Sequence, residues 1–221
     1  GIGQTFQANP VTGTGSMSVP LPVSPGRGGV QPELQLSYDS GAGNSPFGHG
    51  WQVGIPNIQR KTSKGLPTYR DGSGSGTADE DVFVFSEAEE LVPLLFDANG
   101  GVGEPDWQPD VRTEGTVTIV RYRPRVEGGF ARIERHRDSS TGITWWTTVS
   151  SANVVRTYGA SASARVADPA DPSRVFQWLL EDVEDERGHR VRYEYKAEDR
   201  AGVTEASPCE AARRKTGVAY A

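Results

Sequence analysis

Cysteine is almost absent from this chain. The single cysteine, Cys209, excludes an internal disulfide and a metal cage built from cysteines. Histidine is scarce as well: the chain has His49, His136 and His189, and no two of them have the spacing of zinc ligands. We therefore expect neither a disulfide framework nor a metal site, and nothing in the sequence points to a cofactor.

Long hydrophobic runs and a basic charge excess are also missing. No apolar stretch approaches the roughly 20 residues that a transmembrane helix needs. The formal net charge is −6, from 23 basic and 29 acidic residues, whereas nonspecific binding to nucleic acid or anionic membrane needs a basic surface. Neither partner is expected. The chain begins at Gly1 without a methionine or a signal-like segment, so we expect a piece of a longer polypeptide whose start does not reveal its export route.

Motifs of common enzyme classes are missing too. No serine lies in a Gly-x-Ser-x-Gly elbow, and residues 41–43 are no dinucleotide fingerprint because Pro46 would break the helix that must follow. EAE at 87–89 and EDE at 184–186 match the Glu-x-Glu string of ADP-ribosyltransferases. The first lacks a Ser-x-Ser strand before it, and the second lies in an acidic turn before Gly188. Both strings are interpreted as solvated hairpin turns, and we expect no enzyme.

One glycine-rich loop has a weak likeness to a calcium-binding loop. Asp71, Ser73 and Ser75 place oxygens at alternate positions, and Gly76 follows. The twelfth position, where a bidentate Glu is expected, is Val82, and two serines replace carboxylates. We interpret this loop as a flexible connection without a metal.

Glycine and proline are abundant, with 27 and 15 residues. This density leaves little room for long helices and predicts an all-β fold of antiparallel hairpins in a meander, with few or no helices. Prolines alternate along the first candidate strand, which predicts an edge strand or an extended arm. Possible internal breaks lie near 71–80, 97–110 and 160–173. Strands are predicted at residues 17–23, 33–38, 51–58, 81–85, 91–96, 116–122, 130–136, 143–149, 153–158, 174–183 and 189–195.

The segment YDSGAGNSPFGHGW, residues 38–51, is the most distinctive part of the chain. Glycine reaches backbone conformations that side chains forbid, so a segment this rich in it is typical of a long, specifically folded β-connection. It contains no good nucleophile. We predict a structural motif formed by Tyr38, Gly41, Gly43, Pro46, Gly48, Gly50 and Trp51.

Aromatic and arginine side chains are candidates for a binding surface. Trp145 and Trp146 are neighbours on a predicted strand and point to opposite faces, so that one is expected in the core. A flat stacking surface for sugars is the alternative to core packing for Trp51, Trp107, Trp178, Tyr69 and Tyr122. Four arginines on two adjacent strands are expected to face acidic partners or rings on an exposed sheet face; they are Arg121, Arg123, Arg132 and Arg135.

Four long motifs together resemble a known family. They are ANPVTGTGSMSVPLPVSPGRGG, LQLSYDSGAGNSPFGHGW, RKTSKGLPTYRD and SRVFQWLLEDVEDERGH, in that order, within residues 6–200. They are similar to the SpvB-type N-terminal domain, which opens a Salmonella plasmid virulence protein and the B component of insecticidal Tc toxin complexes. By this resemblance, residues 1–221 form one SpvB-type β domain of a larger toxin protein.

The resemblance implies a secreted bacterial toxin component. Its partners would be the remainder of its own polypeptide, with propeller and RHS-like regions, and toxin components of the C and A types. The domain would contribute β-sheet to a shell that holds a cytotoxic cargo.

The sequence therefore predicts a non-catalytic structural domain. An autonomous surface or glycan-binding module is the alternative, and a transferase dependent on Glu184 or Glu186 is a remote third. The expected inner contacts are Leu34, Leu36, Tyr38, Trp51, Val53, Ile55, Phe83, Phe85, Trp178 and Leu180.

Overall fold

A computed structural model gives the architecture of the chain, and almost all of its regular structure is β. The two helical segments among the described residues are three-residue 3-10 turns, η1 (Arg27–Gly29) and η2 (Ala162–Ala164). The prediction of an all-β fold is confirmed. No helix in the described part of the chain is long and apolar enough to cross a membrane. The structure describes residues 7–8, 13–32, 34–45, 47–63, 65–71, 80–86, 89–126 and 130–196.

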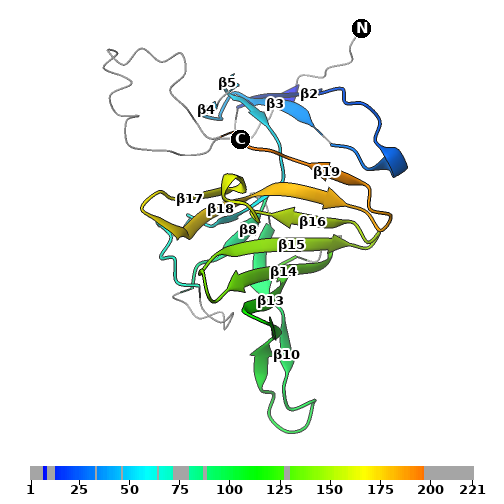
Figure 1. Cartoon of the computed structure of the whole chain (residues 1–221). Helices are drawn as coiled ribbons and strands as arrows, with labels where there is room; N and C mark the ends of the chain where they lie inside the picture. Colours follow the sequence, from blue (N-terminus) through cyan, green and yellow to red (C-terminus); the bar gives the residue numbers. More distant parts are fainter. Residues whose placement is uncertain are drawn as a thin grey trace.

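The centre of the molecule is a closed barrel of eight antiparallel strands (Figure 1). The last strand closes the ring by pairing with the first, with Pro93 opposite Tyr122 and Leu91 opposite Pro124. In spatial order the strands are β13 (Val117–Pro124), β14 (Phe130–Asp138), β15 (Thr144–Ser150), β16 (Val155–Tyr158), β18 (Asp171–Glu184), β7 (Asn57–Arg60), β8 (Phe83–Phe85) and β9 (Glu89–Pro93).

Strands β13 to β16 follow one another as the predicted meander, with short turns from β14 to β15 and from β15 to β16. Gly142 and Asn153 adopt positive φ in these two turns. Three shorter strands extend the barrel sheet at its edges: β12 (Val111–Glu114) pairs with β13, whereas β17 (Arg165–Asp168) and β19 (Arg190–Arg192) pair with β18. β12 and β17 carry no clear alternation and were not predicted.

A second sheet, here called the N-terminal sheet, has the strand order β1 (Gln7–Ala8), β2 (Gly15–Pro20), β3 (Gln35–Asp39) and β6 (Trp51–Val53). A small ladder of β4 (Asn44–Ser45) and β5 (Gly48–His49) lies between β3 and β6 in the chain. β1 contacts β2 through Gly15 and Ser16 alone, so the rest of β2 is an edge within the described residues, as its prolines predict.

The prediction of one strand over residues 51–58 is wrong. β6 belongs to the N-terminal sheet, and β7 belongs to the barrel. The Ile55 amide donates to the Val53 carbonyl at 3.0 Å, which turns the chain, and Pro56 has no N–H with which to continue a ladder. This turn links the two sheets.

Edge-to-face aromatic packing fills the barrel. Trp146 lies 5.0 Å from Phe83, 5.0 Å from Tyr122 and 6.0 Å from Trp178, measured between ring centroids. Phe83, Trp178 and Leu180 are buried, and Ile55 and Phe85 pack against them, so these predicted contacts are confirmed. The predicted contacts on β3 and β6, and Leu34 before β3, are half-buried in the N-terminal sheet instead.

A two-stranded ribbon projects from the barrel at the end opposite the N-terminal sheet (Figure 1). It consists of β10 (Leu95–Asp97), β11 (Trp107–Pro109) and the turn between them. We call residues 94–110 the arm.

Candidate functional site

The glycine-rich segment forms the connection between β3 and β6. Gly48 and Gly50 have φ of +108° and +78°, which a residue with a side chain rarely adopts. A Cβ at Gly50 would lie 2.7 Å from the Tyr38 ring and 2.8 Å from the Asp39 carbonyl oxygen. Gly41 is also tight, since its Cβ would lie 2.9 Å from the Thr14 methyl, whereas Gly43 faces open space. Pro46 lies outside the described residues.

The two aromatic ends of this segment face each other across the sheet. Tyr38 and Trp51 are direct cross-strand partners, and their ring centroids are 5.1 Å apart. Gly50 donates to the Gly43 carbonyl at 3.0 Å, and Asp39 donates to the Gly50 carbonyl at 2.8 Å. The Ser45 hydroxyl donates to the Trp51 carbonyl. These contacts hold the connection between β3 and β6 in one conformation. That the connection is needed for folding remains a prediction.

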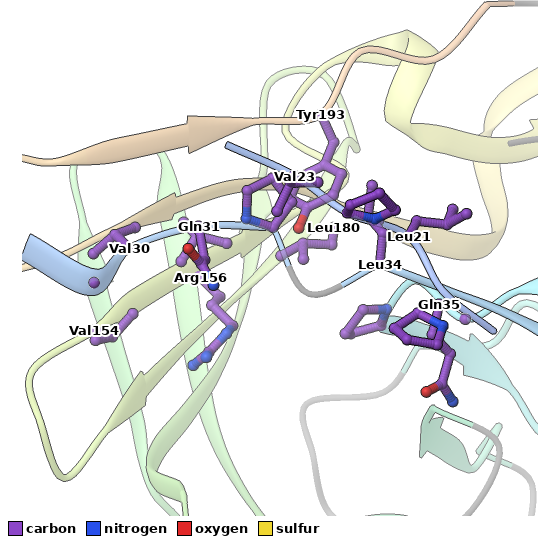
Figure 2. A pocket seen from close by; sticks show the side chains of 17 residues that line it. Leu21, Val23, Val30, Gln31, Leu34, Gln35, Val154, Arg156, Leu180 and Tyr193 are labelled. Carbon is purple, nitrogen blue, oxygen red and sulfur yellow. The ribbon is translucent and has the colours of Figure 1, made fainter. Parts of the chain in front are cut away.

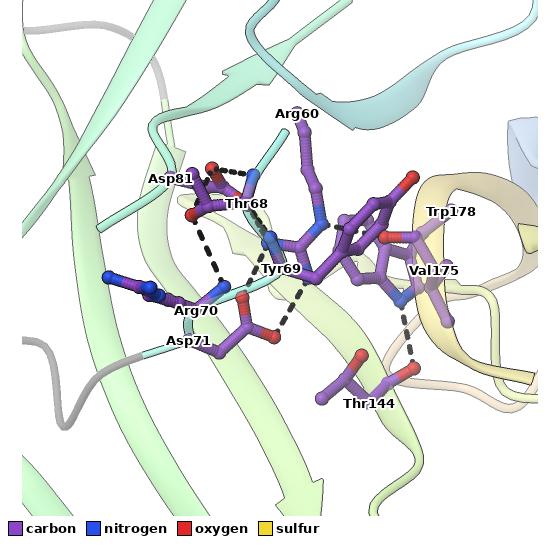
Figure 3. A network of polar contacts seen from close by, with 9 residues as sticks. All are labelled: Arg60, Thr68, Tyr69, Arg70, Asp71, Asp81, Thr144, Val175 and Trp178. Carbon is purple, nitrogen blue, oxygen red and sulfur yellow. Dashed lines mark hydrogen bonds and ion pairs between the residues drawn. The ribbon is translucent and has the colours of Figure 1, made fainter. Parts of the chain in front are cut away.

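The most concentrated charge inside the molecule surrounds Arg60 at the end of β7 (Figure 3). Its guanidinium donates to both Asp71 oxygens at 2.5 and 2.8 Å and to Asp81 Oδ2 at 2.9 Å. Its Nε donates to the Val175 carbonyl at 2.7 Å. Asp81 also accepts the backbone N–H of Tyr69 at 2.7 Å, which holds the segment before Asp71 against the barrel.

Three rings surround the same guanidinium. Its central carbon lies 5.0 Å from the Tyr69 centroid, 5.2 Å from Phe83 and 5.4 Å from Trp178, within cation–π range. Burial by itself raises the pKa of the Asp71 carboxyl, but the hydrogen bond and charge of Arg60 outweigh it, so the pKa lies below its usual value. These contacts join β7 to Tyr69, Asp71 and Asp81, and we call the group the Arg60 lock.

A second guanidinium lies inside the barrel on β14. Arg135 is 3% exposed, and its central carbon lies 5.4 Å from the Phe83 centroid and 5.8 Å from that of Tyr122. The prediction that Arg135 faces outward is therefore wrong, because register places it beside Ile133 on the inner face. The outward prediction holds for Arg121, which pairs with Asp110 at 3.0 Å, and Arg132 lies 3.5 Å from Glu134.

The sequence contained one signal for the Arg60 lock. Ile58 and Arg60 are two residues apart on a strand and so share a face, which buries the arginine wherever Ile58 is core. The motif RKTSKGLPTYRD holds both Arg60 and Asp71, but nothing in its spacing says that the two side chains meet.

A groove of about 770 Å³ lies between the N-terminal sheet and the barrel (Figure 2). One wall comes from residues 20–23, 29–32 and 34–35, and the other includes Leu180, Val183 and Tyr193. Arg156 is the one charged side chain among the described lining residues. Most of the described lining residues have apolar side chains, and these residues place no general acid beside a base or nucleophile.

The structure favours core packing over the alternative of one flat aromatic stacking surface. Trp146, Trp178 and Tyr122 are buried, whereas Trp145 lies on the opposite face and stacks on His136 at 5.2 Å. Trp107 is 61% exposed on the arm, far along the chain from Trp51. The aromatic residues therefore lie in separate parts of the molecule and do not share one surface.

The remaining candidates have local structural partners. Asp185 of the 184–186 string accepts from the His189 ring at 2.8 Å in the turn between β18 and β19. His136 Nε2 lies 2.9 Å from the Thr147 hydroxyl, and His49 is exposed. Within the described ranges, no group of three His, Cys, Asp or Glu side chains could hold a metal. Residues 72–79 and 87–88 lie outside those ranges, and with them most of the calcium-like loop and the first Glu-x-Glu string.

Family comparison agrees with the motifs. The model of the SpvB family, described as Salmonella virulence plasmid 65kDa B protein, matches residues 9–220. The chain belongs to the SpvB family. The mono(ADP-ribosyl)transferase SpvB of Salmonella typhimurium strain 14028s is 33% identical over 220 residues, which cover 99% of this chain and 35% of that protein. The chain thus spans about a third of the length of the curated relatives it matches.

Solved structures of SpvB-family and Tc toxin proteins share the fold. The crystal structure of TcdB2-TccC3 matches with a TM-score of 0.77 and 34% identity, over 100% of this chain and 10% of that one. The N-terminal domain of effector protein SpvB from Salmonella typhimurium strain LT2 matches with a TM-score of 0.74 and 34% identity, over 92% of this chain and 61% of that one. The toxin and virulence associations of the resemblance are confirmed.

Proposed function

We propose that this chain is a non-catalytic structural domain of a bacterial toxin or virulence protein. It contributes β-sheet to a shell that encloses or helps deliver a cytotoxic cargo. The observation that carries this proposal is the match of the whole chain to a tenth of the TcdB2-TccC3 chain, at a TM-score of 0.77. A domain that is a small part of a very long chain acts through its contacts with the rest of that chain.

The internal chemistry supports a structural role. Aromatic rings and two guanidiniums pack in the interior of the barrel, as expected of an eight-stranded barrel that is filled by its own side chains. Arg60 engages the two carboxylates beside it, Asp71 and Asp81. The buried carboxylates Glu134 and Asp182 are paired with arginines as well. Transferase activity named for the curated relatives is not carried over, since this chain spans about a third of them.

The proposed partners follow from the same match. They are the remainder of the polypeptide, with propeller and RHS-like regions, and toxin components of the C and A types. The proposed location is outside the bacterial cell, as part of a secreted toxin. The possible breaks near 71–80, 97–110 and 160–173 are proposed as junctions inside one domain.

An autonomous glycan-binding module is the second candidate. The observation in its favour is the 61% exposure of Trp107, since an exposed ring offers a stacking face to a sugar. Titration of tryptophan fluorescence with a glycan panel separates the two functions. A Trp107→Ser variant that loses a saturable shift supports the binding module.

Co-elution of this chain with the separately expressed remainder of its polypeptide tests the proposed function. A stable one-to-one complex that restores a compact particle is expected. A chain that is well folded and monomeric but does not associate would contradict the shell role and favour the binding module.

A further inference from the structure

Exposed apolar side chains gather on the arm. The described residues hold nine large hydrophobic side chains that are exposed, and four of these nine lie on the arm. They are Leu95 at 44%, Phe96 at 50%, Val102 at 78% and Trp107 at 61%, and Val111, the first residue of β12, follows at 39%. Single exposed hydrophobic residues are ordinary, but a cluster of this kind marks an interaction site.

Both faces of the ribbon contribute. Leu95 pairs with Pro109, and Asp97 pairs with Trp107, so Leu95 and Trp107 lie on one face. Phe96 pairs with Gln108 on the other face. A two-stranded ribbon has little stability of its own in water, and this one projects away from the barrel (Figure 1). The exposed side chains of the arm therefore favour insertion into a cleft of a partner rather than packing against this domain's own core.

The turn of the arm is nevertheless held in one conformation. The Asp97 carboxylate accepts the backbone N–H groups of Asn99, Gly101 and Asp106 at 3.0, 2.9 and 3.0 Å. Ala98 also donates to the Asp106 carbonyl at 2.8 Å. An ordered turn reduces the entropy lost on docking. The exposed rings are thus presented by a preorganised element.

The acidic charge of the arm limits the kind of partner that it can bind. Residues 94–111 contain Asp97, Glu104, Asp106 and Asp110 and no Lys, Arg or His. Asp97 is engaged in the turn and Asp110 pairs with Arg121, which leaves Glu104 and Asp106 as the acids of the tip. Asp106 accepts a hydrogen bond from the neutral Gln108 amide at 2.7 Å, so its charge is not neutralised by that contact. Two arms packed on each other would bring these acids together, so the charge disfavours a second copy.

We propose that the arm docks into an apolar cleft bordered by Lys or Arg, supplied by the part of the polypeptide beyond this domain. Leu95 and Trp107 enter the cleft from one face of the ribbon, and the acidic tip meets its basic rim. This inference rests on the proposed function for the source of the cleft. The source is indicated by coverage, because the chain makes up 35% of its curated relative and leaves most of such a polypeptide to supply a partner.

Photo-crosslinking in the full-length polypeptide tests this docking. The photoreactive residue is introduced as Trp107→p-benzoylphenylalanine, with Leu66→p-benzoylphenylalanine as the matched control, since Leu66 is 92% exposed and outside the arm. We expect intramolecular crosslinks from position 107 to a segment beyond residue 221 whose peptides carry Lys or Arg. The yield should be several-fold above the control and should fall several-fold at high salt, where the acidic tip is screened.

Each other result overturns the proposal. A covalent dimer through position 107 would assign the arm to a second copy. A yield equal to that of the control would leave the arm without a partner, and a crosslinked segment without basic residues would contradict the charge argument. If the chain still co-elutes with its remainder while position 107 gives no crosslink, the arm proposal fails and the shell role stands. Absence of co-elution counts against the shell role itself.

Discussion

Arg60 lies at a position that is 1% exposed. Two carboxylates, one carbonyl and three rings surround its guanidinium there. A buried charge is costly to leave without its partners, whereas the complete pair is close to neutral in its net contribution. The lock therefore specifies which segment lies against the barrel more than it adds stability.

Arg60→Ala should be strongly destabilising, because it leaves Asp71 and Asp81 without their shared partner. We expect a loss of about 3–5 kcal/mol in the free energy of unfolding, measured by chemical denaturation. Arg174→Ala is the control, since Arg174 is 55% exposed and pairs at the surface with Asp171, where about 0–1 kcal/mol is expected. Equal effects of the two variants would show that the lock has no special role.

Gly50→Val should disturb folding, because the valine would meet the Tyr38 ring and the Asp39 carbonyl at a φ of +78°. A loss of more than about 1 kcal/mol is expected. Gly43→Val is the matched control in the same segment, as its Cβ would enter open space and its φ is ordinary. Thermal melts of both variants test this. A Gly50→Val variant that melts like the parent would refute the interpretation of the glycine-rich connection as a fixed connector.

His136 gives stability a pH dependence. Burial lowers the pKa of His136 below 6.5, against the opposing charge of Glu134. The unfolded chain therefore binds the proton more readily than the folded chain does. The contribution of neutral His136 to the free energy of unfolding is complete above pH 6.5 and is lost as the pH falls toward the lowered folded pKa. His136→Asn should flatten the stability profile between pH 7 and 5.5, by at most about 1.4 kcal/mol per pH unit. Identical profiles for parent and variant would contradict this assignment.

At the scale of elements, local alternation predicted most of the barrel strands but not their closure. Thr144, Trp146 and Thr148 alternate inward as a half-buried strand should, and the strand over residues 143–149 is confirmed. Pairing of β18 with β7 joins residues more than a hundred positions apart, and no local pattern encodes it. Residues 51–58 form two strands instead of the one predicted, because the chain turns at Ile55. The strand-like pattern of these residues did not reveal that turn.

The candidate sites were predictable to a similar extent. The glycine-rich segment stands out in composition, and its aromatic ends indeed pair. Arg135 was misplaced because charge predicts an exposed side chain, while the register of β14 places it inside among rings. The arm was divided between a predicted strand over residues 91–96 and a possible break over 97–110. The proposed function of the arm depends on which of its apolar side chains are exposed to solvent, and the sequence alone does not show this.

Removal of the arm should leave the barrel intact. The arm crosses no part of the aromatic core, and its large hydrophobic side chains are exposed. Replacing residues 96–108 by an Asn-Gly turn should change the free energy of unfolding by about 0.5 kcal/mol or less, as for surface changes generally. Urea denaturation followed by the fluorescence of the buried tryptophans measures this. A loss of cooperative unfolding would mean that the arm belongs to the folding unit of the barrel.

At the scale of the whole molecule, the two larger sheets of the described chain are joined by one short turn, and the arm lies at the far end (Figure 1). The barrel is closed and needs no further strands, whereas β2 and β6 leave open edges in the described part of the N-terminal sheet. Open edges and an apolar arm are the features by which a structural domain joins a larger wall. In the proposed shell, the closed barrel is the rigid body between these two contact regions.

Electron cryomicroscopy of the full-length polypeptide tests the central claim most directly. The account predicts that this domain lies within a continuous shell, with an edge of the N-terminal sheet extended by a strand from elsewhere in the polypeptide. The arm should be seated in a basic-rimmed cleft. A domain that hangs from the particle on a linker, with free sheet edges and a solvent-exposed arm, would contradict the structural role.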